Sequence, residues 1–155
     1  GYWLFGPGSK IAHIAPDPLE SGFDAVAAAR HIRAKRTALK VALMDQTVVS
    51  GVGNIYADEA LWRAGLSPRR KASGVLQRDA LALVDAARDV MSEALAVGGT
   101  SFDALYVNVN GESGYFDRSL HAYGRVGGPC DRCGTPLEKI VLGGRGTHYC
   151  PRCQH

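Results

Sequence analysis

Four cysteines near the end of the chain have the type and spacing of a metal site. Cys130 and Cys133 form one Cys-x2-Cys pair, Cys150 and Cys153 form a second, and sixteen residues separate the two pairs. Each pair can direct two thiolates at one centre, and four thiolates complete a tetrahedral shell around Zn²⁺ that leaves no position for water. We therefore expect one structural zinc ion. Two disulfides are the alternative, but we recognise no signal peptide that would favour an oxidising compartment.

The residues between the cysteine pairs are expected to form a β-hairpin. Residues 139–142 have strand-forming side chains, residues 143–144 are two glycines that permit a turn, and residues 147–149 are expected to form the returning strand. A hairpin this small buries little apolar surface, so the metal would supply most of its folding free energy. Hairpins of this kind bind DNA, RNA or protein, and the zinc site alone therefore leaves the function open.

Upstream of the cysteines the apolar pattern is helical. It predicts helices over residues 23–31, 38–44, 55–64 and 76–97, with Ser21 at the start of the first and Thr37 as the cap of the second. The last helix carries an apolar stripe at Leu76, Ala80, Leu83, Val84, Ala87, Met91, Ala94 and Leu95. The expected fold is mainly α: a helix bundle followed by a zinc-ribbon-like β-hairpin zinc finger.

The segment between the second and third helices must turn tightly. Its sequence QTVVSGVG contains Gly51 and Gly53 and delivers Asn54 to the start of a helix. The free N–H groups and the positive dipole end of a helix N-terminus accept a phosphate. Asn54 could also be a simple N-cap that binds nothing, and on spacing alone we favour the cap.

Basic charge is concentrated in one block of the chain. The net charge is +3, but residues 30–78 carry ten basic and three acidic residues, whereas residues 79–106 carry one basic and five acidic residues. Basic surfaces flanking an acidic helix are typical of a protein that binds the phosphate backbone of nucleic acid. A solvated helical face is the alternative. No apolar run approaches the roughly eighteen residues of a membrane span, so we expect no membrane partner.

Two stretches resemble the motifs of one family. Residues 45–68, DQTVVSGVGNIYADEALWRAGLSP, resemble the helix–two-turn–helix signature of the formamidopyrimidine-DNA glycosylase and endonuclease VIII family. Residues 110–154 resemble that family's C-terminal zinc finger. The resemblance implies four parts of the chain: 1–15, a remnant of an N-terminal β-sandwich with a linker; 16–106, the helix–two-turn–helix domain; 107–121, a connector that folds over the damaged base; and 122–155, the zinc finger.

The resemblance implies a role in base-excision repair. The family removes oxidised purines, such as 8-oxoguanine and formamidopyrimidines, by attack of an N-terminal proline amine on the sugar of the flipped-out nucleotide. It then cuts the strand at the abasic site as a lyase. The implied partner is double-stranded DNA with a damaged base or an abasic site, and we expect a monomer in the bacterial cytoplasm, associated with DNA.

Five residues match DNA-contacting positions of the family: Arg36, Lys40, Asn54, Tyr123 and Arg145. Asn54 matches an asparagine that binds a phosphate beside the lesion, which shifts our interpretation from cap to contact. Lys40 matches a lysine that reaches toward the lesion. Arg145 matches the arginine that grips the same backbone and is the family's catalytic proton donor for δ-elimination. Because the pKa of arginine lies above about 12, its electrostatic role is the firmer expectation.

The family's proline nucleophile, the glutamate after it and a further catalytic lysine have no counterpart in these 155 residues. Without the amine nucleophile the covalent mechanism has no starting point. We therefore expect the chain by itself to bind duplex DNA and to leave damaged bases in place. It would be the DNA-binding half of a longer glycosylase and lyase or, alternatively, a naturally truncated, non-catalytic protein that recognises abasic or nicked sites.

Overall fold

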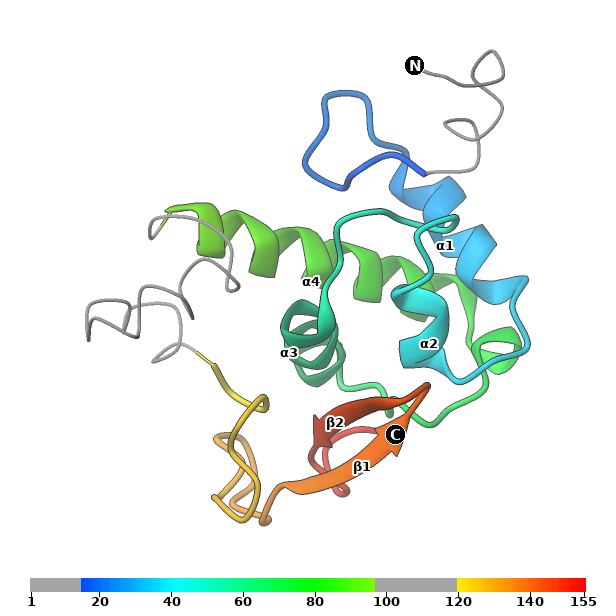
Figure 1. Cartoon of the computed structure of the whole chain (residues 1–155). Coiled ribbons are helices and arrows are strands. Elements are labelled where there is room, and N and C mark those ends of the chain that lie inside the picture. Colours follow the sequence, from blue (N-terminus) through cyan, green and yellow to red (C-terminus); the bar gives the residue numbers. More distant parts are fainter. Residues whose placement is uncertain (1–14, 97–119) are drawn as a thin grey trace.

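A computed structural model describes residues 15–96 and 120–155, which form a helix bundle with a β-hairpin packed beneath it (Figure 1). The helices are α1 (Ala25–Arg33), α2 (Leu39–Leu43), α3 (Asn54–Ala64) and α4 (Gln77–Ala96), and a short 3-10 turn, η2 (Ala72–Gly74), precedes α4. Strands β1 (Glu138–Leu142) and β2 (Arg145–Tyr149) pair antiparallel. The expectation of a mainly α chain that ends in a zinc-finger hairpin is confirmed.

Two of the expected parts fall largely outside the described residues. They are the β-sandwich remnant over residues 1–15 and the connector over residues 107–121. Of the helices that the structure describes, none has the length and apolar character needed to span a membrane.

Helix α1 begins two residues later than predicted. The Asp24 carboxylate accepts a hydrogen bond from the Ala27 N–H at 3.0 Å, and α1 therefore starts at Ala25. The predicted start at Ser21 and Phe23 is wrong, because the carboxylate at position 24 satisfies a free N–H group of the first turn.

Helix α2 is shorter than predicted and has no side-chain cap. Its cap residue is Ala38, so the expected cap at Thr37 is wrong. The first N–H groups of α2 are satisfied by the backbone of the segment after α3 instead. Leu39 donates to the Arg70 carbonyl at 2.7 Å, and Lys40 donates to the Pro68 carbonyl at 3.2 Å.

Two successive turns in residues 44–53 connect α2 to α3. In the first, the Val48 N–H donates to the Asp45 carbonyl at 2.9 Å. In the second, Gly51 has a φ of +85°, and a Cβ there would lie 2.7 Å from a carboxylate oxygen of Asp17. Glycine is therefore required both for the backbone conformation and for the close approach.

The helices share one apolar core with α3 at its centre. Every residue of α3 from Ile55 to Trp62 is buried. From the predicted stripe, α4 buries Ala80, Leu83, Val84, Ala87, Met91 and Ala94. Leu76 and Leu95 do not belong to that stripe, because they are 49% and 55% exposed. Leu76 lies before the first residue of α4, and Leu95 lies in its last turn.

A buried carboxylate of α3 holds the segment that leads into the zinc finger. Glu59 is 1% exposed, and its carboxylate accepts the backbone N–H groups of His121, Ala122 and Tyr123 at 2.7, 2.7 and 2.8 Å. Hydrogen bonds to a charged acceptor are short and strong, and three of them compensate for the loss of water around the carboxylate. Residues 121–123 are thus fixed to the middle of α3.

The Trp62 side chain brings α3 into the core of the finger. Its indole N–H donates to the Cys130 sulfur at 3.4 Å, its ring stacks on His121 with centroids 4.4 Å apart, and the Arg132 guanidinium lies 3.7 Å from its ring centre. Trp62 forms a second small core with Ala122, Cys130, Leu137 and Cys150. The finger therefore depends on a side chain that it does not itself supply.

The last residues of the chain return to the end of α3. His155 donates its N–H to the Gly65 carbonyl and accepts the Ser67 N–H, both at 3.0 Å. The Gln154 side chain donates to the Leu66 carbonyl at 3.0 Å. Helices and finger are thus joined along the whole length of α3.

Replacement of Glu59 by Gln should destabilise the zinc-loaded protein by about 3 kcal/mol. The amide has the shape of the carboxylate, but its NH₂ group faces backbone donors, so at least one buried N–H loses its acceptor. Urea denaturation measures the change. Glu93→Gln is the matched control, since that carboxylate is half exposed and pairs with Arg63, and it should cost no more than about 1 kcal/mol. Equal losses of unfolding free energy in the two variants would contradict the conclusion that Glu59 holds residues 121–123 to α3.

Candidate metal centre and nucleic-acid interface

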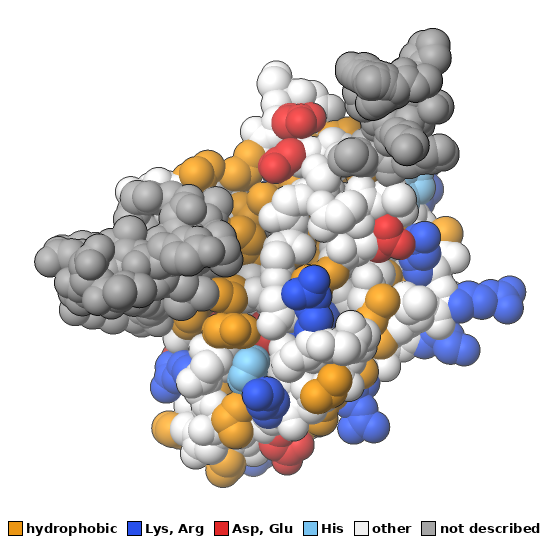
Figure 2. Space-filling view, in the orientation of Figure 1, with side chains coloured by type: hydrophobic (Ala, Val, Ile, Leu, Met, Phe, Trp, Pro, Cys, Tyr) orange, Lys and Arg blue, Asp and Glu red, His pale blue; other side chains and the backbone are white. Residues whose placement is uncertain are grey.

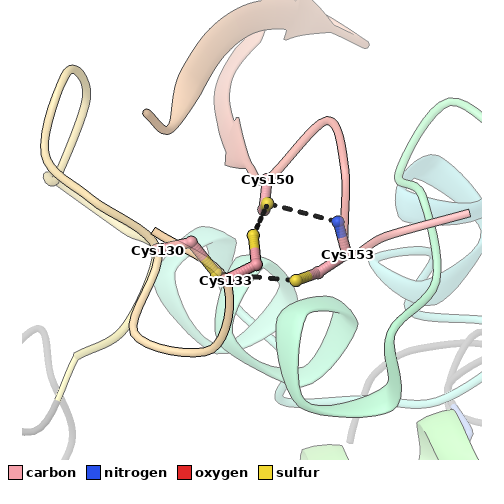
Figure 3. Close-up of side chains that lie close together, drawn as sticks. All are labelled: Cys130, Cys133, Cys150 and Cys153. Carbon is pink, nitrogen blue, oxygen red and sulfur yellow. Dashed lines mark hydrogen bonds between the residues drawn. The ribbon is translucent and has the colours of Figure 1, made fainter. Parts of the chain in front are cut away.

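The four cysteines come together at one point (Figure 3). Their sulfur atoms all lie within 4.8 Å of one another, with 3.8 Å between Cys130 and Cys153 and 3.5 Å between Cys133 and Cys150. A tetrahedron with Zn–S bonds of about 2.3 Å has edges of about 3.8 Å. All four are free thiols, so the alternative of two disulfides is wrong. The geometry fits one structural Zn²⁺, as predicted.

The thiols differ in how readily they release a proton. Hydrogen bonds with the side chain and backbone of Thr135 lower the pKa of Cys133 to about 6. The hydrogen bond with the Cys133 sulfur is the main cause that raises the pKa of Cys153 to about 12. Because zinc binds thiolates, uptake of the metal must release the remaining protons, and zinc affinity therefore rises with pH.

Two of the predicted DNA-contacting residues, Lys40 and Asn54, meet at the backbone carbonyl of the residue that follows a third, Arg145. The Gly146 oxygen accepts hydrogen bonds from Lys40 Nζ at 3.0 Å and from Asn54 Nδ2 at 3.1 Å. Gly146 follows Arg145, the first residue of β2 after the turn at residues 143–144. The two turn glycines have φ of +57° and +77°, as in the tight hairpin turns that match the twist of paired strands.

Asn54 is the first residue of α3, and Gly53 occupies the cap position. The interpretation of Asn54 as an N-cap is therefore wrong, since its side chain bonds to β2 instead. Within residues 15–96 and 120–155, the backbone N–H groups of Asn54 and Ile55 have no acceptor, and Asn54 Oδ1 has no partner. The N-terminus of α3 thus keeps free donors beside the hairpin.

Arg145 and Lys40 differ sharply in exposure. Arg145 is exposed, and its guanidinium forms no ion pair with any described residue. It borders a hollow of about 270 Å³ between α2 and the hairpin turn, which Asp45 also lines. Lys40 is 1% exposed and directs its ammonium group into the protein. Burial lowers the pKa of Lys40, and the nearby Arg145 charge acts in the same direction, whereas Asp58 opposes the shift.

The two other predicted contact residues lie apart from this convergence. Arg36 is exposed in the loop between α1 and α2. Tyr123 is half-buried in the finger, where its ring meets the His148 ring edge-on at 4.7 Å. Lys and Arg side chains are spread over the lower and right-hand parts of the face shown in Figure 2.

Asp58 and Glu59, the two acids buried side by side on α3, have roles that were not predicted from the sequence. Asp58 contacts β2 and Lys40, and Glu59 contacts residues 121–123. The sequence did contain a signal: Asp58 and Glu59 interrupt an otherwise apolar stretch, and Asp58 has no basic residue three or four positions away. An acid so placed must find its partner elsewhere in the fold.

Two family models match the chain in the order of its two structural parts. The formamidopyrimidine-DNA glycosylase H2TH domain matches residues 14–105. The zinc finger found in FPG and IleRS matches residues 127–155.

Curated relatives support the same assignment. The formamidopyrimidine-DNA glycosylase of Corynebacterium aurimucosum is 71% identical over 155 residues, which are all of this chain and 55% of that protein. That of Mycolicibacterium gilvum is 60% identical over 146 residues, which are 94% of this chain and 52% of the relative. The chain spans about half the length of the curated relatives that it matches.

Solved structures share the fold. The MutM (Fpg) protein of Thermus thermophilus has a TM-score of 0.81 and 38% identity over 96% of this chain and 57% of its own. The Lactococcus lactis formamidopyrimidine-DNA glycosylase, bound non-covalently to DNA with an AP site, has a TM-score of 0.82 and 33% identity over 96% and 53%. Both domain models, these relatives and the four-cysteine centre lead to one conclusion: the chain belongs to the formamidopyrimidine-DNA glycosylase family.

Proposed function

We propose that this chain is the DNA-binding half of a bifunctional DNA glycosylase and AP lyase that acts on oxidised purines in base-excision repair. The observation that carries the proposal is the convergence of Lys40 and Asn54 on the Gly146 carbonyl, which sets the exposed Arg145 beside the free N-terminus of α3. Relatives crystallised with abasic or 8-oxoguanine-containing DNA support it. By itself the chain binds DNA and does not excise bases.

A phosphate group fits the donors gathered at this point. The backbone N–H groups of Asn54 and Ile55 and the second amide proton of Asn54 point from the positive end of α3. The Arg145 guanidinium can donate to two phosphate oxygens at once. These donors would hold the backbone beside the lesion, and the Arg145 charge would stabilise the phosphate leaving group in δ-elimination.

The remaining predicted contacts extend the same DNA-binding face. Tyr123 on the finger and Arg36 before α2 would reach neighbouring phosphates. Lys40 would have to exchange its three protein contacts for DNA in order to approach the lesion. The zinc ion, when bound, cross-links the two ends of the hairpin and offers no open coordination position. We also propose a cytoplasmic monomer, since zinc-bound thiolates suit a reducing compartment and one chain supplies all these donors.

DNA binding should be salt-dependent and should require Asn54 and Arg145. With a duplex that carries one tetrahydrofuran abasic analogue, fluorescence anisotropy should show log K falling linearly with log salt concentration, by about 0.9 for each phosphate contacted. Asn54→Ala and Arg145→Ala should each weaken binding about tenfold or more. Arg145→Ala should also make the slope shallower by about one.

Arg63→Gln serves as the control for these variants. Arg63 lies at the other end of α3, and its guanidinium is already paired with Glu93 at 2.6 and 2.7 Å. Its loss should change DNA affinity by less than about twofold. The proposal would be contradicted if DNA affinity did not depend on salt concentration and did not change in Asn54→Ala or Arg145→Ala. That result would instead favour a zinc finger that contacts protein.

Removal of zinc should weaken DNA binding strongly but leave the helices folded. The helices have their own apolar core, whereas the finger's small core includes Cys130 and Cys150. After treatment with a chelator, circular dichroism should retain most of the helical signal while DNA affinity falls at least about tenfold, and added Zn²⁺ should restore binding. Full DNA affinity in the metal-free protein would show that the hairpin is not needed.

A further inference from the structure

Asp58 lies at the centre of a buried polar network between α3 and the finger. It is completely buried and stands four residues after Asn54, so both side chains project from the same face of α3 toward β2. Asp58 Oδ2 accepts the His148 backbone N–H at 3.0 Å and lies 3.0 Å from His148 Nδ1. Asp58 Oδ1 lies 2.8 Å from Lys40 Nζ.

The Lys40 ammonium group makes three polar contacts within this network. It donates hydrogen bonds to Thr147 Oγ1 at 2.8 Å and to the Gly146 carbonyl at 3.0 Å, and it forms an ion pair with Asp58 Oδ1 at 2.8 Å. A buried ammonium group is tolerated only when a charged partner and hydrogen bonds replace its water. Asp58 is the only acid in the described residues that pairs with Lys40, so it favours the charged form of Lys40 against the effect of burial and holds the ammonium group in place.

Lys40 in turn fixes the backbone that carries Arg145. The Gly146 carbonyl receives hydrogen bonds from both Lys40 and Asn54, so both of its acceptor positions are filled. Asn54 thereby keeps one amide proton free, and the backbone next to Arg145 is held beside the first turn of α3. The network thus links the buried Asp58 carboxylate to the exposed Arg145 guanidinium, although the two groups are not in contact.

We propose that Asp58 is a positioning residue for DNA binding, which holds Arg145 at the N-terminus of α3 through Lys40 and the Gly146 carbonyl. The inference rests on the proposed function, because it explains how two of the proposed phosphate contacts, Arg145 and Asn54, are aligned. Asp58 itself makes no contact with DNA, since no part of it is exposed.

The test compares Asp58→Asn with wild type on the duplex that carries one tetrahydrofuran site, across a salt series. The amide cannot balance the Lys40 charge, so the Arg145 backbone is released. Affinity should fall about tenfold and the salt slope should become shallower by about one, as one phosphate contact is lost. In the Asp58→Asn background, Arg145→Ala should then cost less than about twofold. A simple loss of stability would lower the active fraction without changing the slope.

Asp89→Asn is the control, because it removes the same charge from an exposed position of α4 and should leave the slope unchanged. If Asp58→Asn does not retain one equivalent of zinc, the double variant K40M/D58L replaces it, because it removes both buried charges of this pair. The expected slope and the small additional effect of Arg145→Ala are the same.

The two ideas fail in different ways. The positioning role is overturned if the Asp58 variant has the salt slope of the wild type and Arg145→Ala still lowers its DNA affinity about tenfold. The proposed function would remain valid in that case. Absence of salt-dependent binding by the wild-type chain overturns the proposed function itself.

Discussion

Asp58 and Glu59 place two carboxylates inside the protein, where each accepts hydrogen bonds from the finger at 2.7 to 3.0 Å. Successive residues of a helix point about 100° apart, so one acid faces β2 and the other faces residues 121–123. A buried carboxylate that loses its donors is strongly unfavourable. The finger therefore cannot separate from α3 by small steps, and helices and hairpin behave as one body.

This docking explains how the proposed DNA-binding face can form from distant segments. The proposed phosphate donors come from the first turn of α3, from the hairpin and from the segment that enters the finger, and these three segments are separate in the sequence. Zinc fixes the internal shape of the hairpin, whereas the α3 carboxylates and Trp62 fix its position on the bundle. Both are required for the proposed contacts of Arg145 and Asn54 with one strand of DNA.

Local features were predictable from the sequence, and long-range pairings were not. The spacing within each cysteine pair sets its ligand geometry, so the prediction of a zinc site was confirmed. Helix starts were displaced, because a cap depends on one hydrogen bond, and Asp24 made it instead of Ser21. Lys40 was predicted as a DNA contact by resemblance, yet its ammonium group is buried against Gly146, which lies 106 residues away in the sequence. Apolar periodicity carries no information about such a pairing.

Hydrogen exchange of individual amides in the zinc-loaded protein tests the central claim most directly. The His148 and Ala122 N–H groups donate to Asp58 and Glu59, so they open only if the finger leaves α3. If helices and finger form one body, these two amides should exchange as slowly as the buried Leu61 amide in α3. Exchange of His148 and Ala122 that is faster by orders of magnitude, with Leu61 still protected, would show that the finger opens independently and would contradict the account.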